Sequence, residues 1–457
     1  TLGEVAAIEA GKSFAAEARP AEGDEWGIIK VSAMTYGEFR AEENKAVVDP
    51  SRIDERFKIH PGDILLSRAN TAKYVGASVT VHGSPGNLLL SDKSLRLTPS
   101  PPVDSRWFAH YLGSPDIRAQ ISDRATGTKD SMRNIPQKDL QKLPVPLPPL
   151  LEQHRIVEAL EDHLSRLDAA ELTLSQAKER AANLSGKAIN FSYGITTSAD
   201  GGAMPPTPAD VLDGDLPSLP TAWSWRRLGE LGEVVGGITK DAKKQSDQSY
   251  PLHSYLRVAN VQSGHLNLDH ITEIRATPKQ VEKLTLRDGD VLLNEGGDRD
   301  KLGRGWVWEN QIPNCLHQNH VFRVRVDPEE INPRLIAWHA NSFGRSWFMR
   351  NGKQSVNLAS VSLKTIKAFP VPVPPPEEQE SIVESITTAL DSQSRLQSAI
   401  DVALARSTAL RRSLLRAAFN GELVDQDPTN EPADVALAKN RDQQAGTVPR
   451  RRRKAAK

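Results

Sequence analysis

The sequence of 457 residues has one cysteine, Cys315, and no net charge, with 58 basic and 58 acidic residues. A single cysteine excludes internal disulfides and cysteine-rich zinc sites, and we expect a cytoplasmic compartment. Since no run of about 18 apolar residues occurs, a transmembrane helix is not expected. The first residues show no basic stretch followed by an apolar one, so we expect no signal peptide. The overall charge does not indicate a nucleic-acid partner.

The signatures of common catalytic and metal sites are also missing. Gly11-Lys12-Ser13 resembles the end of a Walker A loop, but Ala6 stands where that loop needs its first glycine. Neither the Asn-Pro-Pro-aromatic signature of an aminomethyltransferase nor a Gly-x-Gly-x-x-Gly fingerprint occurs. The segment 315–320 holds a cysteine and two histidines, but their side chains alternate along an expected strand, so we interpret them as structural. We therefore predict no catalytic residue and no metal site in this chain.

One long internal repeat organises the sequence. A proline run followed by Glu-Gln and Ile-Val-Glu occurs at 144–158 and again at 370–384, with ten of fifteen positions identical at an offset of 226. Further matches follow at nearly the same offset: Leu2-Gly3-Glu4 with Leu228-Gly229-Glu230, and Gly62-Asp63-Ile64 with Gly289-Asp290-Val291. Because the matches keep their order, they indicate a tandem duplication of a domain and a connector.

The first part of each repeat has the pattern of a mixed α/β domain. Apolar runs after a Gly-Asp turn, at 64–66 and 291–293, predict strands, whereas 106–119 and 334–349 predict helices. We therefore expect an α+β fold with two tandem mixed domains.

A long helix is predicted after each proline run. From Ile156 and from Ile382, apolar or small residues recur at spacings of four and three without an interrupting proline. Roughly 40 residues at 1.5 Å each give helices about 60 Å long. Since neither apolar seam suits water, the two helices are expected to pack on each other. The main seam residues are Ile156, Leu160, Leu167, Leu174, Ile382, Ile386, Leu396, Ile400 and Leu414.

The connecting segments complete the division of the chain. The proline runs are expected to be stiff extended hinges, with a PxxP ligand for a partner module as the alternative. The basic end at 450–454 is either a solvated tail or a region that attracts phosphates. The predicted segments are the first domain 1–143, the hinge and helix 144–195, the linker 196–220, the second domain 221–369, the hinge and helix 370–423, and the disordered polar tail 424–457.

Two loops have the composition of a DNA-reading surface, with a plain solvated loop as the alternative. Each follows a Gly-Asp strand and combines basic with amide or acidic side chains, which suit the edges of different bases. The segment 221–369 has 21 basic and 16 acidic residues, a net of +5, whereas 1–143 has 19 of each. The candidate DNA-binding residues in these loops are Arg68, Asn70, Lys73, Tyr74, Arg299, Lys301 and Arg304. Lys129, Arg133, Lys353 and Gln354 occupy similar places before each proline hinge and are candidates too.

Together these features resemble the specificity subunit of type I restriction–modification systems. The resemblance rests on two tandem α/β halves, each ending in Pro-Val-Pro-x-Pro-Pro, Glu-Gln, Ile-Val-Glu and a long helix, and it extends from Leu2 to about Leu423. Gln318-Asn319-His320 in the second half adds to it, whereas Ser91-Asp92-Lys93 stands where Gln-Asn-His is expected in the first half.

The resemblance implies a division of labour. Each domain would be a target recognition domain that reads one part of a split DNA sequence, and the helices would pair antiparallel and set the distance between the parts. A pseudo-two-fold axis would match two methyltransferase subunits carrying S-adenosylmethionine, and translocase–endonuclease subunits would add ATP and Mg²⁺. The seam-bearing helices would dock these partners, while this chain would hold no cofactor and contact no membrane. A non-catalytic scaffold with duplicated protein-binding domains and a free-standing enzyme are the alternatives.

Overall fold

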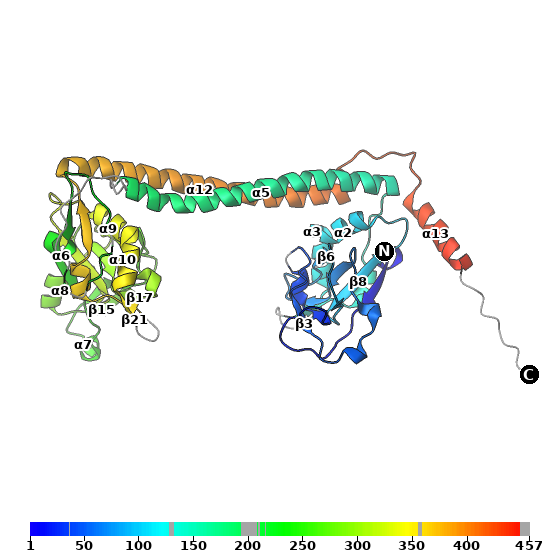
Figure 1. Ribbon diagram of the computed structural model, residues 1–457, viewed down its shortest axis with the longest axis horizontal. Helices are drawn as coiled ribbons and strands as arrows, with labels where there is room; N and C mark the ends of the chain where they lie inside the picture. The colour runs from blue at the N-terminus through cyan, green and yellow to red at the C-terminus, as the bar shows by residue number, and fades with distance from the viewer. Residues whose placement is uncertain are drawn as a thin grey trace, which may run out of the picture. The chain divides into compact units, whose positions relative to one another are not determined.

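The computed structural model forms two compact units (Figure 1). Unit 1 consists of Thr1–Leu174 and Val402–Lys457, and unit 2 of Ser175–Asp401. Each unit contains one globular part and a portion of both long helices, α5 (Leu150–Ser192) and α12 (Pro376–Phe419). The structure describes residues 1–35, 37–127, 132–192, 208, 211–214, 216–354 and 359–447.

A four-stranded antiparallel sheet forms the centre of each globular part. In unit 1 the strand order is β1 (Ala6–Ala10), β8 (Ser94–Pro99), β4 (Ile64–Ser67) and β6 (Ser78–Thr80). In unit 2 it is β11 (Gly232–Gly236), β20 (Val321–Val326), β16 (Val291–Asn294) and β18 (Gly305–Val307). The shared topology confirms the tandem α+β fold that the sequence predicts.

A glycine turn precedes β4 and β16. Gly62 and Gly289 have φ values of +88° and +83°, in the left-handed region that favours glycine. The carboxylates of the following Asp63 and Asp290 accept hydrogen bonds from backbone N–H groups three residues upstream, at 2.9 and 2.7 Å. The repeated Gly-Asp pair is therefore a conformational requirement of the turn that starts each strand.

Smaller sheets flank each centre. The mixed sheets are β3 (Asn44–Ala46), β2 (Gly27–Ile29) and β7 (Leu88–Leu89) in unit 1, and β15 (Thr272–Arg275), β12 (Leu252–Leu256) and β19 (Leu316–His317) in unit 2. The loop sheets are β5 (Ala69–Asn70) with β9 (Arg133–Asn134), and β17 (Gly296–Gly297), β22 (Ala359–Ser360) and β21 (Lys353–Gln354). The other elements are α1 (Leu2–Val5), α4 (Gln137–Gln141), α6 (Leu228–Leu231), α7 (Ala242–Ser246), α8 (Pro278–Leu284), α11 (Leu363–Lys367), β10 (Ser224–Arg227), β13 (Val261–Gln262), β14 (His265–Leu266), β23 (Pro370–Val373) and the 3-10 helices η1 (Val31–Met34), η2 (Pro50–Arg52), η3 (Glu55–Phe57) and η4 (Arg299–Lys301).

Each globular part has two short helices where the sequence predicted one. The predicted helix 106–119 is replaced by α2 (Ser105–Gly113) and α3 (Pro115–Arg124), and 334–349 by α9 (Pro333–Asn341) and α10 (Phe343–Asn351). Ser114 and Ser342 have non-helical backbone angles, and Pro115 disfavours a helical conformation of the residue before it. The apolar side chains of α2, among them Trp107 and Phe108, are buried with those of the central sheet.

The long helices are confirmed, and they pack on each other within each unit. The contacts between them are Ser407 with Glu171 at 2.6 Å and Arg411 with Asp168 in unit 1, and Lys178 with Asp401 at 2.7 Å and Gln393 with the carbonyl of Ala181 at 2.6 Å in unit 2. Residue numbers rise on one helix as they fall on the other, so the packing is antiparallel in both units. Among the described residues, no helix is both long and apolar enough to cross a membrane.

The end of the predicted linker 196–220 is packed into unit 2. Val211 and Leu219 are buried, and Asp213 forms a buried ion pair with Arg227 at 2.8 Å. Residues 196–207, 209, 210 and 215 lie outside the described residues. The structure differs from the prediction here because apolar residues spaced along 211–220 fit the core of the second globular part.

The predicted disordered tail 424–457 contains a helix, α13 (Ala433–Thr447), whereas 448–457, with the basic run, lies outside the described residues. Leu437 of α13 packs against the core of unit 1. Residues 433–447 are mostly polar, but they lack proline and include four alanines and two glutamines, which favour helix. Local propensity together with this one apolar contact accounts for the difference.

Candidate nucleic-acid interface

Three segments meet at the end of β4. The backbone N–H of Arg68 donates to the carbonyl of Lys93 at 2.9 Å, and the N–H of Ile135 donates to the carbonyl of Arg68 at 3.0 Å. The pairing of β5 with β9 places Asn70 opposite Arg133. The structure thus brings together three predicted residues from distant parts of the sequence. We call this assembly loop cluster 1, which consists of 67–74, 91–93 and the described part of 126–135.

The predicted side chains of loop cluster 1 are held in different ways. Asn70 is only 8% exposed, and its amide makes hydrogen bonds within its own turn at 2.8 and 3.3 Å. Arg133 donates to two backbone carbonyls at 2.7 and 3.3 Å. Lys73 is exposed, with its ammonium 5.1 Å from the ring centre of Tyr74. Asn70 and Arg133 therefore stabilise the loop, while Lys73 and Tyr74 lie at its surface; Lys129 lies outside the described residues.

The same frame recurs in unit 2 at the end of β16. The N–H of Glu295 donates to the carbonyl of His320 at 3.0 Å, and the N–H of Val361 donates to the carbonyl of Glu295 at 2.8 Å. β17 and β21 flank β22 in a three-stranded sheet. We call this assembly loop cluster 2, which consists of 294–304, 318–320 and the described part of 353–361.

The predicted side chains of loop cluster 2 are mostly at the surface. Arg299 is exposed and donates to the carbonyl of Met349 at 3.2 Å. Lys301 forms an ion pair with Asp298, and Lys353 is exposed on β21. The backbone of Gln354 lies in β21, but its side chain is outside the described part of the structure.

A basic pocket of about 210 Å³ borders loop cluster 2. Its lining residues are Ser263, Lys301, Leu302, Arg304, Ala340, Asn341 and Arg345. Three of these are cations and none is a carboxylate. Nε of Arg304 is buried and has no hydrogen-bond partner among the described residues. A phosphate oxygen is the kind of acceptor that such a guanidinium binds strongly.

Charged side chains that the sequence did not single out lie at both sites. Lys93 and Glu295 occupy the loop clusters, and Arg345 lines the basic pocket. The sequence did contain one signal for Lys93: Ser91-Asp92-Lys93 in the first half differs from the corresponding Gln318-Asn319-His320 in the second. Both segments contact the same backbone position in their own half. Arg345 has no comparable signal, since it reaches the pocket only through the packing of α10.

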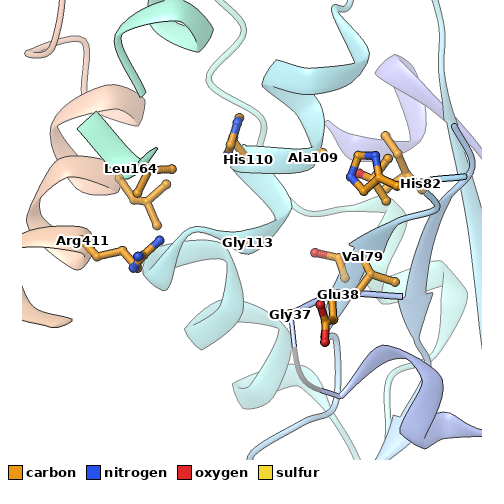
Figure 2. Close-up of a pocket in the computed structure, with 13 residues that line it drawn as sticks. Gly37, Glu38, Val79, His82, Ala109, His110, Gly113, Leu164 and Arg411 are labelled. Carbon is orange, nitrogen blue, oxygen red and sulfur yellow. The ribbon is translucent and has the colours of Figure 1, made fainter. Parts of the chain in front are cut away.

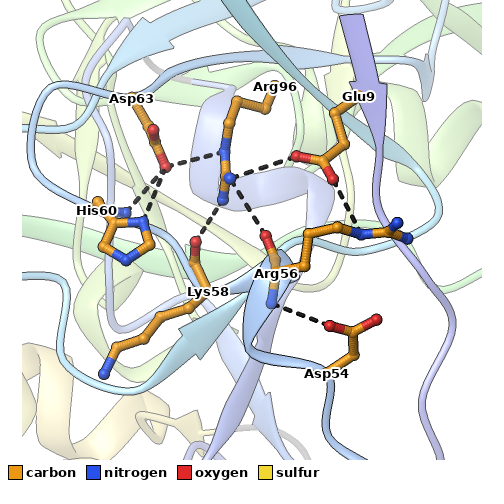
Figure 3. Close-up of polar contacts among 7 residues, drawn as sticks. All are labelled: Glu9, Asp54, Arg56, Lys58, His60, Asp63 and Arg96. Carbon is orange, nitrogen blue, oxygen red and sulfur yellow. Dashed lines mark hydrogen bonds and ion pairs between the residues drawn. The ribbon is translucent and has the colours of Figure 1, made fainter. Parts of the chain in front are cut away.

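A polar network holds the strands that lead into loop cluster 1 (Figure 3). Nε of Arg96 on β8 lies 3.1 Å from Asp63, and its Nη1 lies 3.4 Å from Glu9 on β1. Arg56 also contacts Glu9, at 3.3 Å, and its backbone carbonyl accepts a hydrogen bond from Arg96 at 3.3 Å. These contacts fix the Gly-Asp turn against β1 and so position β4 and the loop that follows it.

The segment 315–320, considered as a metal site, contributes to the core instead. Burial raises the pKa of the Cys315 thiol to about 12. Burial also lowers the pKa of His317 to about 4, and its Nδ1 lies 2.7 Å from the carbonyl of Val321. His320 is half exposed and contacts Glu295. Among the described residues, no group of three or more His, Cys, Asp or Glu side chains is placed to hold a metal ion.

Each unit has a cleft lined by a short helix and by both long helices. In unit 1 the cleft has a volume of about 530 Å³, and Figure 2 shows His110, Leu164 and Arg411 around it, from three different helices. In unit 2 a cleft of about 430 Å³ is lined by the equivalent positions Trp338, Leu390 and, from the opposing helix, Ile189. Each cleft thus lies where a globular part meets the two long helices.

Most of the predicted docking residues on the long helices are committed to the chain's own cores. Ile156, Leu160, Ile382, Ile386 and Ile400 are buried, whereas Leu167, Leu174 and Leu414 are half-buried. Leu396 is 45% exposed, although the spacing placed it in the seam between the helices. The five buried residues hold the helices in place and have no surface to offer a partner. The more exposed apolar residues on these helices are Leu151, Leu172, Leu396, Val402 and Leu410.

Comparison with known proteins gives one family. Residues 1–179 and 220–405 match the type I restriction modification DNA specificity domain. The chain is 24% identical over 415 residues to the type I restriction enzyme StySPI specificity subunit of Salmonella potsdam, covering 90% of this chain and 85% of the relative. It is also 24% identical over 408 residues to the EcoKI specificity subunit of Escherichia coli (strain K12), covering 89% and 84%.

Solved structures share the fold. The HsdS subunit from Thermoanaerobacter tengcongensis superposes with a TM-score of 0.56 at 18% identity, covering 92% of this chain and 96% of that one. A chain from a structure of type I R-M system complex assembly gives a TM-score of 0.64 at 19% identity, covering 92% and 97%. The duplicated arrangement of this chain is therefore found in other structures.

Proposed function

The chain belongs to the family of type I restriction–modification DNA specificity domains, and from this premise we propose that each globular part reads one part of a bipartite DNA target. The chain is the non-catalytic specificity subunit of a type I restriction–modification complex. We assign the reading to residues 1–143 and 221–369, with the loop clusters as the surfaces that enter the DNA groove. The cytoplasm, where the DNA lies, is the compartment we propose.

The repetition of one backbone frame with different side chains carries this proposal. The same pair of backbone hydrogen bonds anchors Arg68 in loop cluster 1 and Glu295 in loop cluster 2. A scaffold that holds two copies of one partner would favour equal side chains at these positions. Two readers of different base sequences need equal frames and unequal side chains, because sequence is read by donors and acceptors on base edges.

Phosphate contacts would supply most of the affinity. The basic pocket beside loop cluster 2 presents Lys301, Arg304 and Arg345, and Lys73 is exposed on loop cluster 1. Contacts of this type fix the position of a protein on the duplex without carrying sequence information. Lys353 and Arg299, both exposed, extend the basic surface of the second half.

The long helices are proposed to set the spacing between the two half-sites. α5 has 43 residues and α12 has 44, so each is about 65 Å long at 1.5 Å per residue. One turn of DNA measures about 34 Å, so a rod of this length spans more than one turn. α5 and α12 pack antiparallel within each unit, which is the pairing that this proposal requires.

Partner subunits are proposed to provide the chemistry. Two methyltransferase subunits with S-adenosylmethionine would modify adenine, and translocase–endonuclease subunits with ATP and Mg²⁺ would carry out restriction. The exposed apolar residues of the long helices and the two clefts are the docking surfaces that we propose for them.

Genome-wide mapping of N6-methyladenine in the source strain, with and without this gene, tests the proposal. We expect deletion to abolish methylation at one split motif and to leave other motifs unchanged. If the methyltransferase genes are expressed and the map does not change, the specificity role is wrong and a scaffold role takes its place. Replacement of residues 1–143 by the corresponding domain of a relative should change one half of the motif only.

A further inference from the structure

Two positions in each loop cluster correspond between the units but differ in chemistry. Arg68 in unit 1 and Glu295 in unit 2 each donate their backbone N–H to the residue just before a neighbouring central strand, β8 or β20. The acceptors are the carbonyls of Lys93 and His320, at 2.9 and 3.0 Å. The pair is therefore Arg68 with Lys93 in one unit and Glu295 with His320 in the other.

In unit 2 the pair presents an oriented hydrogen-bond acceptor. Nδ1 of His320 lies 2.8 Å from Oε2 of Glu295, and Nδ2 of Asn319 lies 3.3 Å from Nε2 of His320. A carboxylate only accepts, so His320 donates from Nδ1, and its Nε2 accepts from the Asn319 amide. The side chains of His320 and Glu295 are 53% and 27% exposed. The chain of contacts orients the carboxylate and leaves it accessible.

In unit 1 the same place presents donors. The guanidinium and the ammonium of Arg68 and Lys93 can only donate hydrogen bonds. Nε of Arg68 is buried without a hydrogen-bond partner among the described residues, and Lys93 is exposed. The position equivalent to Asn319 is Asp92, which is also exposed and is acidic.

We propose that these paired positions determine the base preference of each half. Arg68 with Lys93 selects the acceptor edge of guanine, and Glu295, oriented by His320, selects the exocyclic amino group of cytosine in the major groove. The inference rests on the proposed function and specifies the base chemistry of each half-site. Arginine and lysine are the usual partners of guanine O6 and N7, and acidic side chains accept from the amino group of cytosine.

The negative charge of Glu295 favours a contact with a base over a contact with a phosphate. A carboxylate near the DNA backbone is repelled by phosphates, so Glu295 favours binding only where it accepts from a base. His320 offsets part of that repulsion by donating to the carboxylate. A residue of this sign is therefore suited to selecting sequence rather than adding affinity.

Selection from a randomised duplex pool tests the inference, with the full chain assembled with its methyltransferase subunits. We expect Glu295→Gln to change the preferred base at one position of the second half-site by roughly tenfold, with the first half-site unchanged. The amide both donates and accepts, so the variant should shift toward adenine. The reciprocal exchange, Arg68→Glu with Lys93→His, should remove the preference for guanine at one position of the first half-site. The second half-site should not change.

A matched control is Glu273→Gln, which removes an exposed carboxylate of the same unit outside loop cluster 2. The unchanged half-site reports that each variant is folded and assembled. The inference is overturned if the variants lose affinity equally for all sequences, or if neither exchange changes the preferred base. In that case the proposed function still stands, provided that the wild-type complex selects a bipartite motif. If the wild-type complex selects no motif, the proposed function itself fails and the inference falls with it.

Discussion

The side chain of Gln153 accepts a hydrogen bond at 2.8 Å from the backbone N–H of Asp104, the residue that caps α2. Its amide nitrogen donates to two backbone carbonyls at 2.9 and 3.3 Å, and the side chain is fully buried. Gln379 makes the same three contacts in unit 2, beginning with the N–H of Asn332 at 2.7 Å. The glutamine of the repeated Glu-Gln pair thus fastens each long helix to the short helix of its globular part.

Replacement of this glutamine should destabilise the unit that contains it. Gln153→Ala leaves one N–H and two carbonyls without their partner, which we expect to cost about 2–4 kcal/mol in the free energy of unfolding. Gln379→Ala should have the same effect in unit 2. Urea unfolding of the full chain measures both, and Gln176→Ala, at an exposed position of α5, is the control. Equal midpoints for all three variants would show that the fastening contributes nothing.

Stability of unit 2 should fall in acid because of His339. Its Nε2 lies 3.0 Å from the carbonyl of Pro370, and burial lowers its pKa to about 3 from 6.5. Below pH 6.5 this histidine binds a proton in the unfolded chain but not in the folded chain, so acid favours the unfolded state. The free energy of unfolding is therefore not reduced by His339 above pH 6.5. It decreases as the pH falls toward 3, by up to about 1.4 kcal/mol per pH unit. His317, with a pKa of about 4, adds to the same loss.

Urea unfolding of wild type and His339→Gln between pH 4 and pH 7.5 checks this prediction. The variant should be less stable at pH 7.5 but should lose less stability on acidification. The slope of its free energy of unfolding against pH should correspond to about one proton fewer than in the wild type. His270→Gln, an exposed histidine of the same unit, is the control and should keep the wild-type slope. Parallel pH profiles of wild type and His339→Gln would contradict the buried neutral state. In unit 1 the equivalent contact is a hydrogen bond from Tyr111 to the carbonyl of Pro144.

The basic pocket should contribute affinity without sequence preference. Arg304→Gln removes one cation from its lining, so DNA binding should weaken equally for all sequences. The slope of log binding constant against log salt should decrease by about one. Binding titrations of the assembled complex at several salt concentrations measure this, with Lys279→Ala on the exposed side of α8 as the control. A change in the selected motif would assign Arg304 to base reading instead.

The spacing role of α5 and α12 predicts an effect of helix length alone. Insertion of four residues into both helices at facing positions lengthens the connector by about 6 Å and keeps both globular parts intact. Methylation mapping should then show the same two half-sites with a longer spacer. A change in either half-site, with the spacer unchanged, would contradict the proposal that the helices set the distance.

Repeats and periodicity allowed the fold to be predicted from sequence, while the site required tertiary information. The offset of 226 gave two domains, and the four-three spacing after Ile156 and Ile382 gave the helices. Burial was less predictable: Leu396 follows the spacing but is exposed, because the spacing does not specify which turns face a neighbour. Arg68 and Asn70 were found from loop composition. Lys93 and Glu295 needed the backbone pairing between distant segments, which a local pattern does not encode.

Exposed apolar side chains on the long helices should serve partner binding and not stability. Leu172 and Val402 are 62% and 69% exposed, so Leu172→Ser with Val402→Ser should change the free energy of unfolding by no more than about 0.5 kcal/mol. Copurification of methyltransferase subunits should decrease strongly, because an apolar patch on a helix gains its stabilisation only when a partner covers it. Val435→Ser on α13, also exposed, is the control.

Ile386→Ser, by contrast, removes a fully buried side chain and should destabilise unit 2 by about 2–5 kcal/mol. If the double variant binds its partners as wild type does, the docking surface lies elsewhere, and the two clefts become the next surfaces to substitute.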